Sequence, residues 1–258
     1  MRDRVLRVDN NRVGYAELFY DLVFVFAITQ VSHLLLYHYT PLGALETGLL
    51  FLAVWWVWIY TTWVLNWLDP DSIAIRMLLF AMMAAGLFLS MAIPEAFGAR
   101  GLIFAGAYVA MQLGRTLFML YIVWPDPGRR STYIRISCYF LLSSVFWLAG
   151  GLAQGHDARL ILWLIALGVD FLGPILGYLV PGLGQDRSTN WRVSGAHMAE
   201  RCGLFVIICL GETLLVSGAT FAEMAWTPAG LLAFLASVLA TGGMWWVYFH
   251  IGHRRGAH

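Results

Sequence analysis

Acidic side chains stand inside long apolar stretches of this sequence, where a charged group is seldom found. Asp170 lies near the middle of one such stretch, and Glu212 lies well inside another. A charged group at the centre of a membrane helix costs about 2.5–3.5 kcal/mol on insertion scales. Such groups therefore face the protein interior, pair with each other or line a pathway. Carboxylates in these places could carry protons or small cations.

Glu17 and Asp21 open the first apolar stretch and are four residues apart. This spacing places both carboxylates on one face of a helix. Two like charges there repel each other, so they favour a cation, a metal ion or a shared proton. The alternative is a capping role at the membrane interface, where the positive end of the helix dipole stabilises acids. Capping explains Glu17 well and Asp21 less well.

Arg115 is the arginine inside an apolar stretch, past the middle of the predicted span 102–124. Arginine stays protonated in proteins, so it needs an acidic or anionic partner. Asp170 lies at a similar depth by residue count, and we predict that the two pair directly. Such a pair could lock two helices or belong to a binding site. Pro174 predicts a kink beside Asp170, and Gly173-x-x-x-Gly177 predicts close helix approach; together they are typical of transporter sites.

His197, Glu200 and Arg201 share one helix face by their spacing. In an enzyme they could act as base, orienting group and phosphate clamp. No Gly-x-Ser-x-Gly nucleophile turn accompanies them. Glu212 follows Arg201 by eleven residues, about 16 Å along a helix. Glu212 is the strongest single candidate for coupling to protons or cations.

The composition predicts the elements that position these groups. Of 258 residues, 60% are hydrophobic and 12% are charged, against about 25% charged in soluble proteins. This excludes a disordered chain, and three Cys exclude a disulfide scaffold. The basic residues, all Arg, lie between apolar runs, which argues against nucleic-acid binding. We expect an all-α, polytopic transmembrane helical bundle.

Eight apolar runs are long enough to span a membrane, which takes about 20 residues each. They cover approximately 17–39, 45–67, 73–93, 102–124, 133–152, 160–180, 198–219 and 229–251. The first run is too long for a cleaved signal peptide and should act as an anchor. We predict one transmembrane domain over 1–258, with an Arg-rich tail 1–16, spans within 17–251 and a tail 252–258.

The arginines predict the orientation. Thirteen of the 16 basic residues lie on the side of the N-terminus and two on the opposite side. The positive-inside rule then places both termini in the cytoplasm of a bacterial plasma membrane.

Aromatic residues crowd the second span at Trp55, Trp56, Trp58, Tyr60 and Trp63. They could form a packing or lipid-facing surface. Alternatively, they could form the aromatic wall of a substrate cavity.

Two stretches carry a resemblance to a known family. They are Glu17-Leu-Phe-Tyr-Asp21-Leu-Val-Phe-Val-Phe-Ala-Ile-Thr-Gln30 and the segment from His197-Met-Ala-Glu200-Arg201 to Gly211-Glu212-Thr213. The chain resembles the bacterial low-temperature-requirement A (LtrA) proteins along its whole length. The terminal 245–250 segment also fits, whereas Cys202 stands where a Phe is expected. Family members usually continue with further membrane helices, so the resemblance implies a short or C-terminally truncated member. It supports the importance of the two acidic stretches, but the family's activity is poorly defined.

We therefore hypothesise a proton- or cation-coupled transporter or channel-like protein. Five acids at or within the spans outnumber two arginines, so some acids must be protonated, hydrated or neutralised by an ion. The acids are Glu17, Asp21, Asp170, Glu200 and Glu212, and the arginines are Arg115 and Arg201. The alternatives are an intramembrane enzyme acting on a lipid-linked substrate at the cytoplasmic leaflet, and a structural or sensory protein. Expected partners are the lipid bilayer and protons, small cations or a small molecule, in a monomer or an oligomer. We expect no metal site, no cofactor and no nucleic acid.

Overall fold

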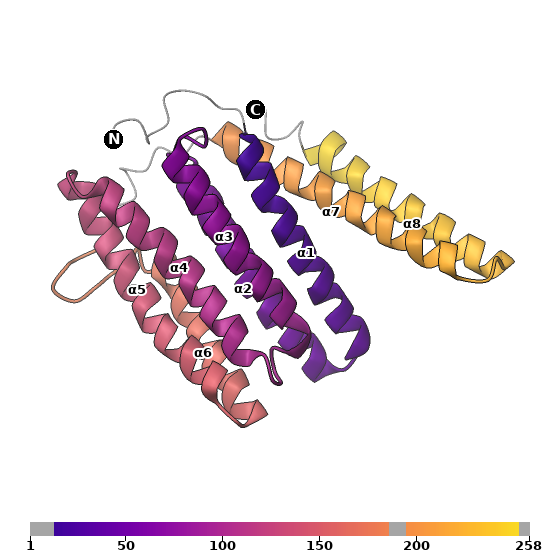
Figure 1. Ribbon diagram of the computed structural model, residues 1–258, viewed down its shortest axis with the longest axis horizontal. Helices are drawn as coiled ribbons and strands as arrows, with labels where there is room; N and C mark the ends of the chain where they lie inside the picture. The colour runs from indigo at the N-terminus through magenta and orange to yellow at the C-terminus, as the bar shows by residue number, and fades with distance from the viewer. Residues whose placement is uncertain (1–12, 186–194, 253–258) are drawn as a thin grey trace. The chain divides into compact units, whose positions relative to one another are not determined.

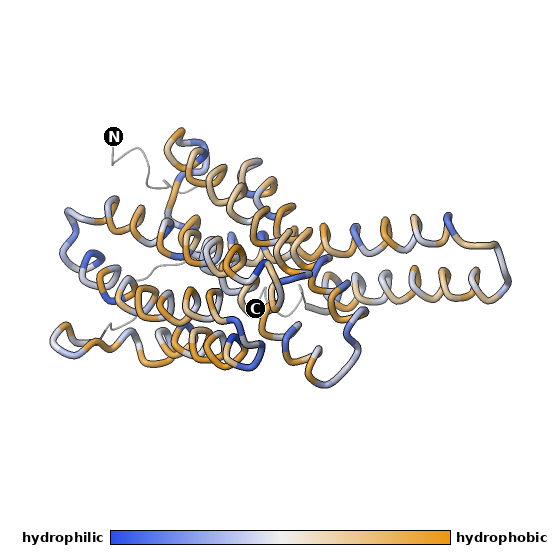
Figure 2. The backbone as a smooth tube through the Cα atoms, turned by 60° about the horizontal axis from the view of Figure 1, so that its bottom comes forward, coloured by the Kyte–Doolittle hydropathy of each residue, from blue (hydrophilic) through white to orange (hydrophobic). Residues whose placement is uncertain are grey.

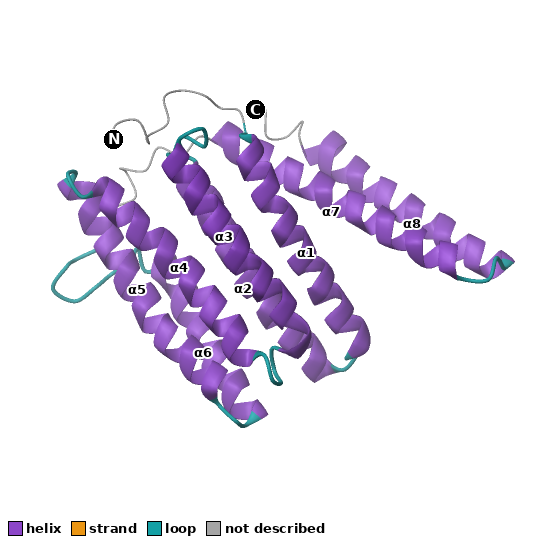
Figure 3. Ribbon diagram, viewed as in Figure 1, coloured by secondary structure: helices purple, strands orange, loops and turns teal. Residues whose placement is uncertain are grey.

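The computed structural model describes residues 13–185 and 195–252. The chain divides into two compact units, Met1–Met198 and Ala199–His258, and each is described by itself. Within the described ranges the elements are helices (Figure 3). An isolated β-bridge joins Val180 and Gly184. One domain over 1–258 stays a prediction, and residues 1–12 and 253–258 of the predicted tails lie outside the described residues.

Eight of these helices are long and apolar enough to cross a membrane, which confirms the all-α, eight-span prediction. Hydrophobic residues cover most of their length (Figure 2). In chain order the helices are α1 (Tyr15–Tyr37), α2 (Pro41–Leu65), α3 (Ile73–Ala92), α4 (Gly101–Val123), α5 (Pro127–Leu152), α6 (His156–Ile175), α7 (Gly195–Glu223) and α8 (Pro228–Trp246). The 3₁₀ turn η2 (Ile93–Glu95) follows α3, and the π-helical η4 (Val247–Gly252) follows α8.

Three helices begin in the same way, with a capping oxygen followed by proline. Thr40, Asp126 and Thr227 each accept hydrogen bonds from backbone N–H groups of the first turn. A proline follows each cap, where its fixed φ suits the helix and its missing N–H costs nothing. Asp126 caps α5 before the apolar run begins, so the helix starts six residues before the predicted span 133–152.

The end of α6 differs from the prediction. The helix ends at Ile175, not at 180, one residue after Pro174, and the predicted kink stays a prediction. Gly177 has a φ of +54°, and the Tyr178 N–H donates to the Gly173 carbonyl at 2.7 Å. A Cβ at Gly173 would lie 2.7 Å from Cε1 of Tyr178. The two glycines therefore allow the chain to turn back over α6. Gly173 also allows close approach of α5, as predicted, since its Cβ would lie 3.3 Å from Cδ1 of Tyr139, whereas Gly177 lies beyond the helix.

The first unit consists of α1 to α6 and the start of α7. Helix α5 packs between α4 and α6, and α3 packs between α1 and α4 (Figure 1). Close approach depends on small residues: a Cβ at Gly151 would lie 3.0 Å from Cα of Leu102. Helix α2 packs on α1 and contacts α4 and α6 less extensively. The rings of Trp56 and Phe171 stack at 4.1 Å across the contact between α2 and α6.

Arg159 stabilises one end of this bundle. Its side chain is 8% exposed, although the sequence places it beside a loop. It donates to the carbonyls of Gly150 at 3.0 Å and Ala153 at 2.9 Å, at the end of α5. It also donates to Ala96 at 3.0 Å and Gly98 at 2.6 Å, beyond η2. One guanidinium thus donates to carbonyls at two helix ends, where the intrahelical donors run out.

The second unit contains α8, η4 and α7 from Ala199 onward. The hydroxyls of Ser217 and Ser237 lie 2.9 Å apart and join α7 to α8. The rings of Phe221 and Phe234 stack at 4.9 Å on the same pair of helices.

Candidate functional site

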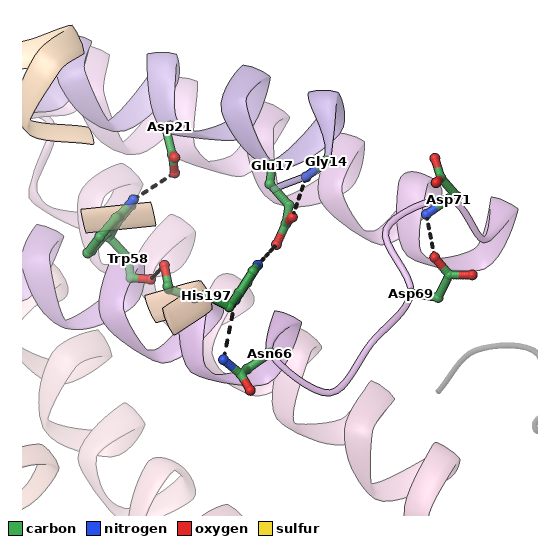
Figure 4. Close-up of polar contacts among 9 residues, drawn as sticks. Gly14, Glu17, Asp21, Trp58, Asn66, Asp69, Asp71 and His197 are labelled. Atoms are coloured by element: carbon green, nitrogen blue, oxygen red, sulfur yellow. Dashed lines mark hydrogen bonds and ion pairs between the residues drawn. The ribbon is translucent and has the colours of Figure 1, made fainter. Parts of the chain in front are cut away.

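Glu17 and His197 form a buried polar cluster with Asn66 (Figure 4). Glu17 Oε2 accepts from the backbone N–H of Gly14 at 2.7 Å, and Oε1 lies 3.5 Å from His197 Nε2. The amide nitrogen of Asn66 lies 3.3 Å from His197 Nδ1. An amide nitrogen donates, so Nδ1 is the acceptor and Nε2 carries the hydrogen that faces Glu17. Glu17 therefore caps α1 and also has an ionisable partner.

Asp21 lies one turn further along α1 and has a different partner. Its Oδ1 accepts from the indole N–H of Trp58 at 2.8 Å (Figure 4), and its carboxylate is fully buried. The spacing of Glu17 and Asp21 predicts a shared cation, metal ion or proton. The described contacts give each carboxylate a donor, from Gly14 and from Trp58, and the shared cation, metal ion or proton stays a prediction. Among the described residues no group of three or more His, Cys, Asp and Glu is arranged to hold a metal ion.

Arg115 is fully buried and reaches from α4 to α2. Its Nη1 donates to the carbonyl of Val57 at 3.2 Å and to Oγ1 of Thr61 at 3.1 Å. Its Nη2 donates to Oε1 of Gln112 on its own helix. The guanidinium carbon also lies 5.1 Å from the centre of the Tyr60 ring, a cation–π distance.

A chain of hydrogen bonds connects Arg115 to Asp170. The Gln112 amide donates to the hydroxyl of Tyr108 at 3.1 Å, and this hydroxyl donates to Asp170 Oδ2 at 2.7 Å. Trp147 on α5 donates to the same oxygen at 3.1 Å. The predicted direct pair of Arg115 and Asp170 is therefore wrong. Tyr108 lies seven residues before Arg115, about 10 Å along α4, and Asp170 bonds at the level of Tyr108.

The same chain continues from Arg115 to α1. The hydroxyl of Tyr20 donates to Thr61 Oγ1 at 2.9 Å, and Thr61 is already bonded to Arg115. The buried network thus joins five helices, α1, α2, α4, α5 and α6. Sequence reasoning missed its neutral members. The spacing of Tyr108, Gln112 and Arg115 at i, i+4 and i+7 on one helix face is the signal that could have indicated them.

The remaining candidates lie on α7 in the second unit. Helix α7 runs without a break from Gly195 to Glu223, so the spacing of His197, Glu200 and Arg201 places them on one helix face, as predicted. Glu212 is half-buried. Beside it, the Thr213 hydroxyl donates to the Cys209 carbonyl at 3.0 Å. The roles of Glu200, Arg201 and Glu212 stay predictions.

Aromatic residues of α2 divide between packing and a cavity. Trp58 packs in the core and Trp56 stacks on Phe171. Tyr60 and Trp63 line a cavity of about 140 Å³ that also reaches Arg115. Packing therefore explains Trp58 and Trp56, whereas a substrate in the cavity beside Tyr60 and Trp63 stays a prediction.

Eight candidate spans and a buried polar network define a polytopic helical membrane protein. The family described as "Bacterial low temperature requirement A protein (LtrA)" matches residues 12–258. The chain belongs to this family, as the resemblance indicates. It is 45% identical over 254 residues to "Uncharacterized protein RA0937" of Rhizobium meliloti (strain 1021), a match covering 96% of this chain and 61% of that protein. The chain thus spans about three fifths of the length of this relative. No solved structure matches it.

Proposed function

We propose that this chain forms a proton- or cation-coupled transporter or channel-like protein of the bacterial plasma membrane, with both termini in the cytoplasm. One observation carries the proposal: Asp170 and Arg115 are linked through neutral groups instead of a direct ion pair. A direct buried pair serves mainly to lock helices, and breaking it is costly. Through the Tyr108 and Gln112 relay, Asp170 can accept a proton and Arg115 can bind an anion without such a break.

Buried acids in the first unit supply further proton-accepting groups. Glu17, Asp21 and Asp170 are all buried. The neutral side chain of a tryptophan donates to Asp21, and that of a tyrosine donates to Asp170. A neutral donor stabilises a carboxylate without cancelling its charge. Intramembrane acids of this kind are typical of proton relays. Glu212 on α7 is proposed as an additional coupling residue, on the sequence argument given above.

Flux in proteoliposomes tests the proposal. Proton and monovalent-cation flux is measured for the full chain and for Asp170→Asn and Glu212→Gln, at matched amounts of folded protein. Asp157→Asn is the matched control on the same helix, because its side chain is 95% exposed. We expect flux above empty liposomes, loss of flux in Asp170→Asn and wild-type flux in the control. Absence of flux, or equal flux in all variants, contradicts the proposal.

An intramembrane enzyme acting on a lipid-linked substrate is the second candidate. Glu17, Asn66 and His197 come from the start of α1, the end of α2 and the start of α7, so they meet at one end of the first unit. His197 would be the base, with Glu200 and Arg201 as orienting group and phosphate clamp. Turnover of a polyprenyl phosphate that His197→Gln abolishes, in liposomes without ion flux, would favour this candidate.

A further inference from the structure

A cavity of about 140 Å³ lies between α2, α4, α5 and α6. Its wall is mostly aromatic and aliphatic, with Tyr60, Trp63, Tyr133 and Ile136 among the lining residues. Arg115 is the charged residue of this lining. An apolar cavity near 150 Å³ is large enough to hold one benzene ring. The space therefore suits one flat ring with a small substituent.

The guanidinium of Arg115 keeps donors for a ligand. It has five N–H bonds, and its three side-chain and backbone hydrogen bonds use Nη1 twice and Nη2 once. Nε is buried and makes no hydrogen bond. An unbonded buried donor is destabilising, and Nε–H together with Nη2–H is the edge that binds a carboxylate bidentately. Nε–H and the second Nη2–H are thus the donors that an anionic ligand could use.

We infer that this cavity binds a small organic monoanion with a flat apolar body, of which an aromatic carboxylate is the simplest form. The carboxylate pairs with Arg115 and the ring lies against Tyr60 and Trp63. Inorganic phosphate fits less well, since it offers four polar oxygens and no apolar surface to this lining. A lipid headgroup shares the anionic chemistry but lacks the flat ring.

The cavity has an accessible side between α2 and α6. Trp63 is 43% exposed and Pro174 is also exposed, and both line the cavity. The stacked rings of Trp56 and Phe171 join the same two helices elsewhere along their contact. Pro174 stands in the last turn of α6, and Gly177 and Tyr178 beyond it also line the cavity. A hydrophobic acid could enter here from the surroundings of the bundle.

A role of this cavity in transport rests on the proposed function. An anion beside Arg115 adds a negative charge to a network that already contains Asp170. Uptake of one proton by Asp170 would restore the charge balance through the Gln112 and Tyr108 relay. The substrate would then move together with a proton, as in a symporter.

Binding is measured apart from transport, with the full chain in nanodiscs of zwitterionic lipid. Benzoate is titrated by calorimetry and by quenching of tryptophan fluorescence, beside neutral benzamide and inorganic phosphate. We expect saturable benzoate binding, at least about tenfold tighter than that of benzamide because the charge-assisted bonds are lost. Equal affinity for benzoate and benzamide, or no saturable binding, overturns the inference. Tighter binding of phosphate also overturns it, as does loss of benzoate binding in nanodiscs of anionic lipid, which assigns the site to a headgroup.

Two variants keep the test independent of folding. Arg115→Gln should abolish benzoate binding, but it also disturbs the network. Ile136→Trp fills the cavity from α5 and should weaken benzoate binding at least about tenfold by steric exclusion. Leu141→Trp is the matched control on the exposed side of α5 and should bind as the wild type does. Unchanged binding in Ile136→Trp overturns the inference. Flux without benzoate binding refutes only the ligand class, whereas binding without any flux refutes only the transporter.

Discussion

Replacing Tyr108 by Phe tests whether the relay between Arg115 and Asp170 holds the bundle together. The change removes one oxygen and keeps the ring, which lies 4.4 Å from the Trp147 ring. Two hydrogen bonds disappear: the one donated to Asp170 at 2.7 Å and the one accepted from Gln112 at 3.1 Å. The aromatic packing of α4 against α5 stays in place, so the measured effect belongs to the hydroxyl.

The expected size follows from measured side-chain hydrogen bonds in membrane proteins. These average about 0.6 kcal/mol and reach about 1.7 kcal/mol each. Two such bonds, one of them to a carboxylate, amount to a loss of about 1–3 kcal/mol. The Gln112 amide is left in the core without its acceptor, which favours the upper half of this range. Asp170 still keeps the Trp147 donor at 3.1 Å, so the protein should remain folded.

Reversible unfolding in mixed micelles at increasing dodecyl sulfate measures this loss. The control is Tyr37→Phe, since Tyr37 is 85% exposed at the end of α1 and should change little. Asp170→Asn and the double variant complete a mutant cycle. Because both changes disrupt the same bond, the double loss should be smaller than the sum of the single losses. Additive losses, or a Tyr108→Phe loss equal to that of the control, would refute the relay.

Three further substitutions test the other contacts by the same unfolding assay. Trp58→Phe removes the donor to the carboxylate on α1 and should cost about 1–2 kcal/mol; no loss would contradict that bond. Arg159→Gln removes the guanidinium that caps two helix ends and should cost about 2–4 kcal/mol, with earlier loss of helical circular dichroism on heating. Gly173→Ala places a methyl group 2.7 Å from a tyrosine ring and should cost about 1–3 kcal/mol. Gly168→Ala on the same helix has nothing within 4 Å of the added Cβ and should cost nothing.

The eight spans could be predicted because an apolar run of sufficient length is visible in the sequence. Their ends were less predictable, since caps set them and hydropathy does not. The cap at Asp126 extends α5 beyond its apolar run. At the other extreme, apolar residues continue after Ile175, but Gly177 takes a left-handed conformation and the helix has already ended. Hydropathy cannot distinguish an apolar helix from an apolar turn.

The acids of the site were predictable because a charge in an apolar run is conspicuous. Their partners were not, since Tyr108 and Gln112 are ordinary in a membrane helix. Depth along a helix can be counted from residue number, but the direction of a side chain depends on how the helices rotate against each other. Asp170 bonds at the level of Tyr108, about 10 Å along α4 from Arg115, and Arg115 bonds to α2 instead, so a similar depth by residue count did not produce contact.

The hydrogen bonds between Arg115 and Asp170 are aligned in a way that can couple the two charged groups. Every donor points the same way, from Arg115 to Gln112, from Gln112 to Tyr108 and from Tyr108 to Asp170. A positive charge at one end and a negative charge at the other polarise each neutral group in this direction and strengthen the chain. Neutralising Asp170 reduces this polarisation and should therefore weaken the hydrogen bond from Arg115 to Gln112. Protonation of Asp170 should therefore alter the hydrogen bonds of the Arg115 guanidinium at the cavity, about two helical turns away.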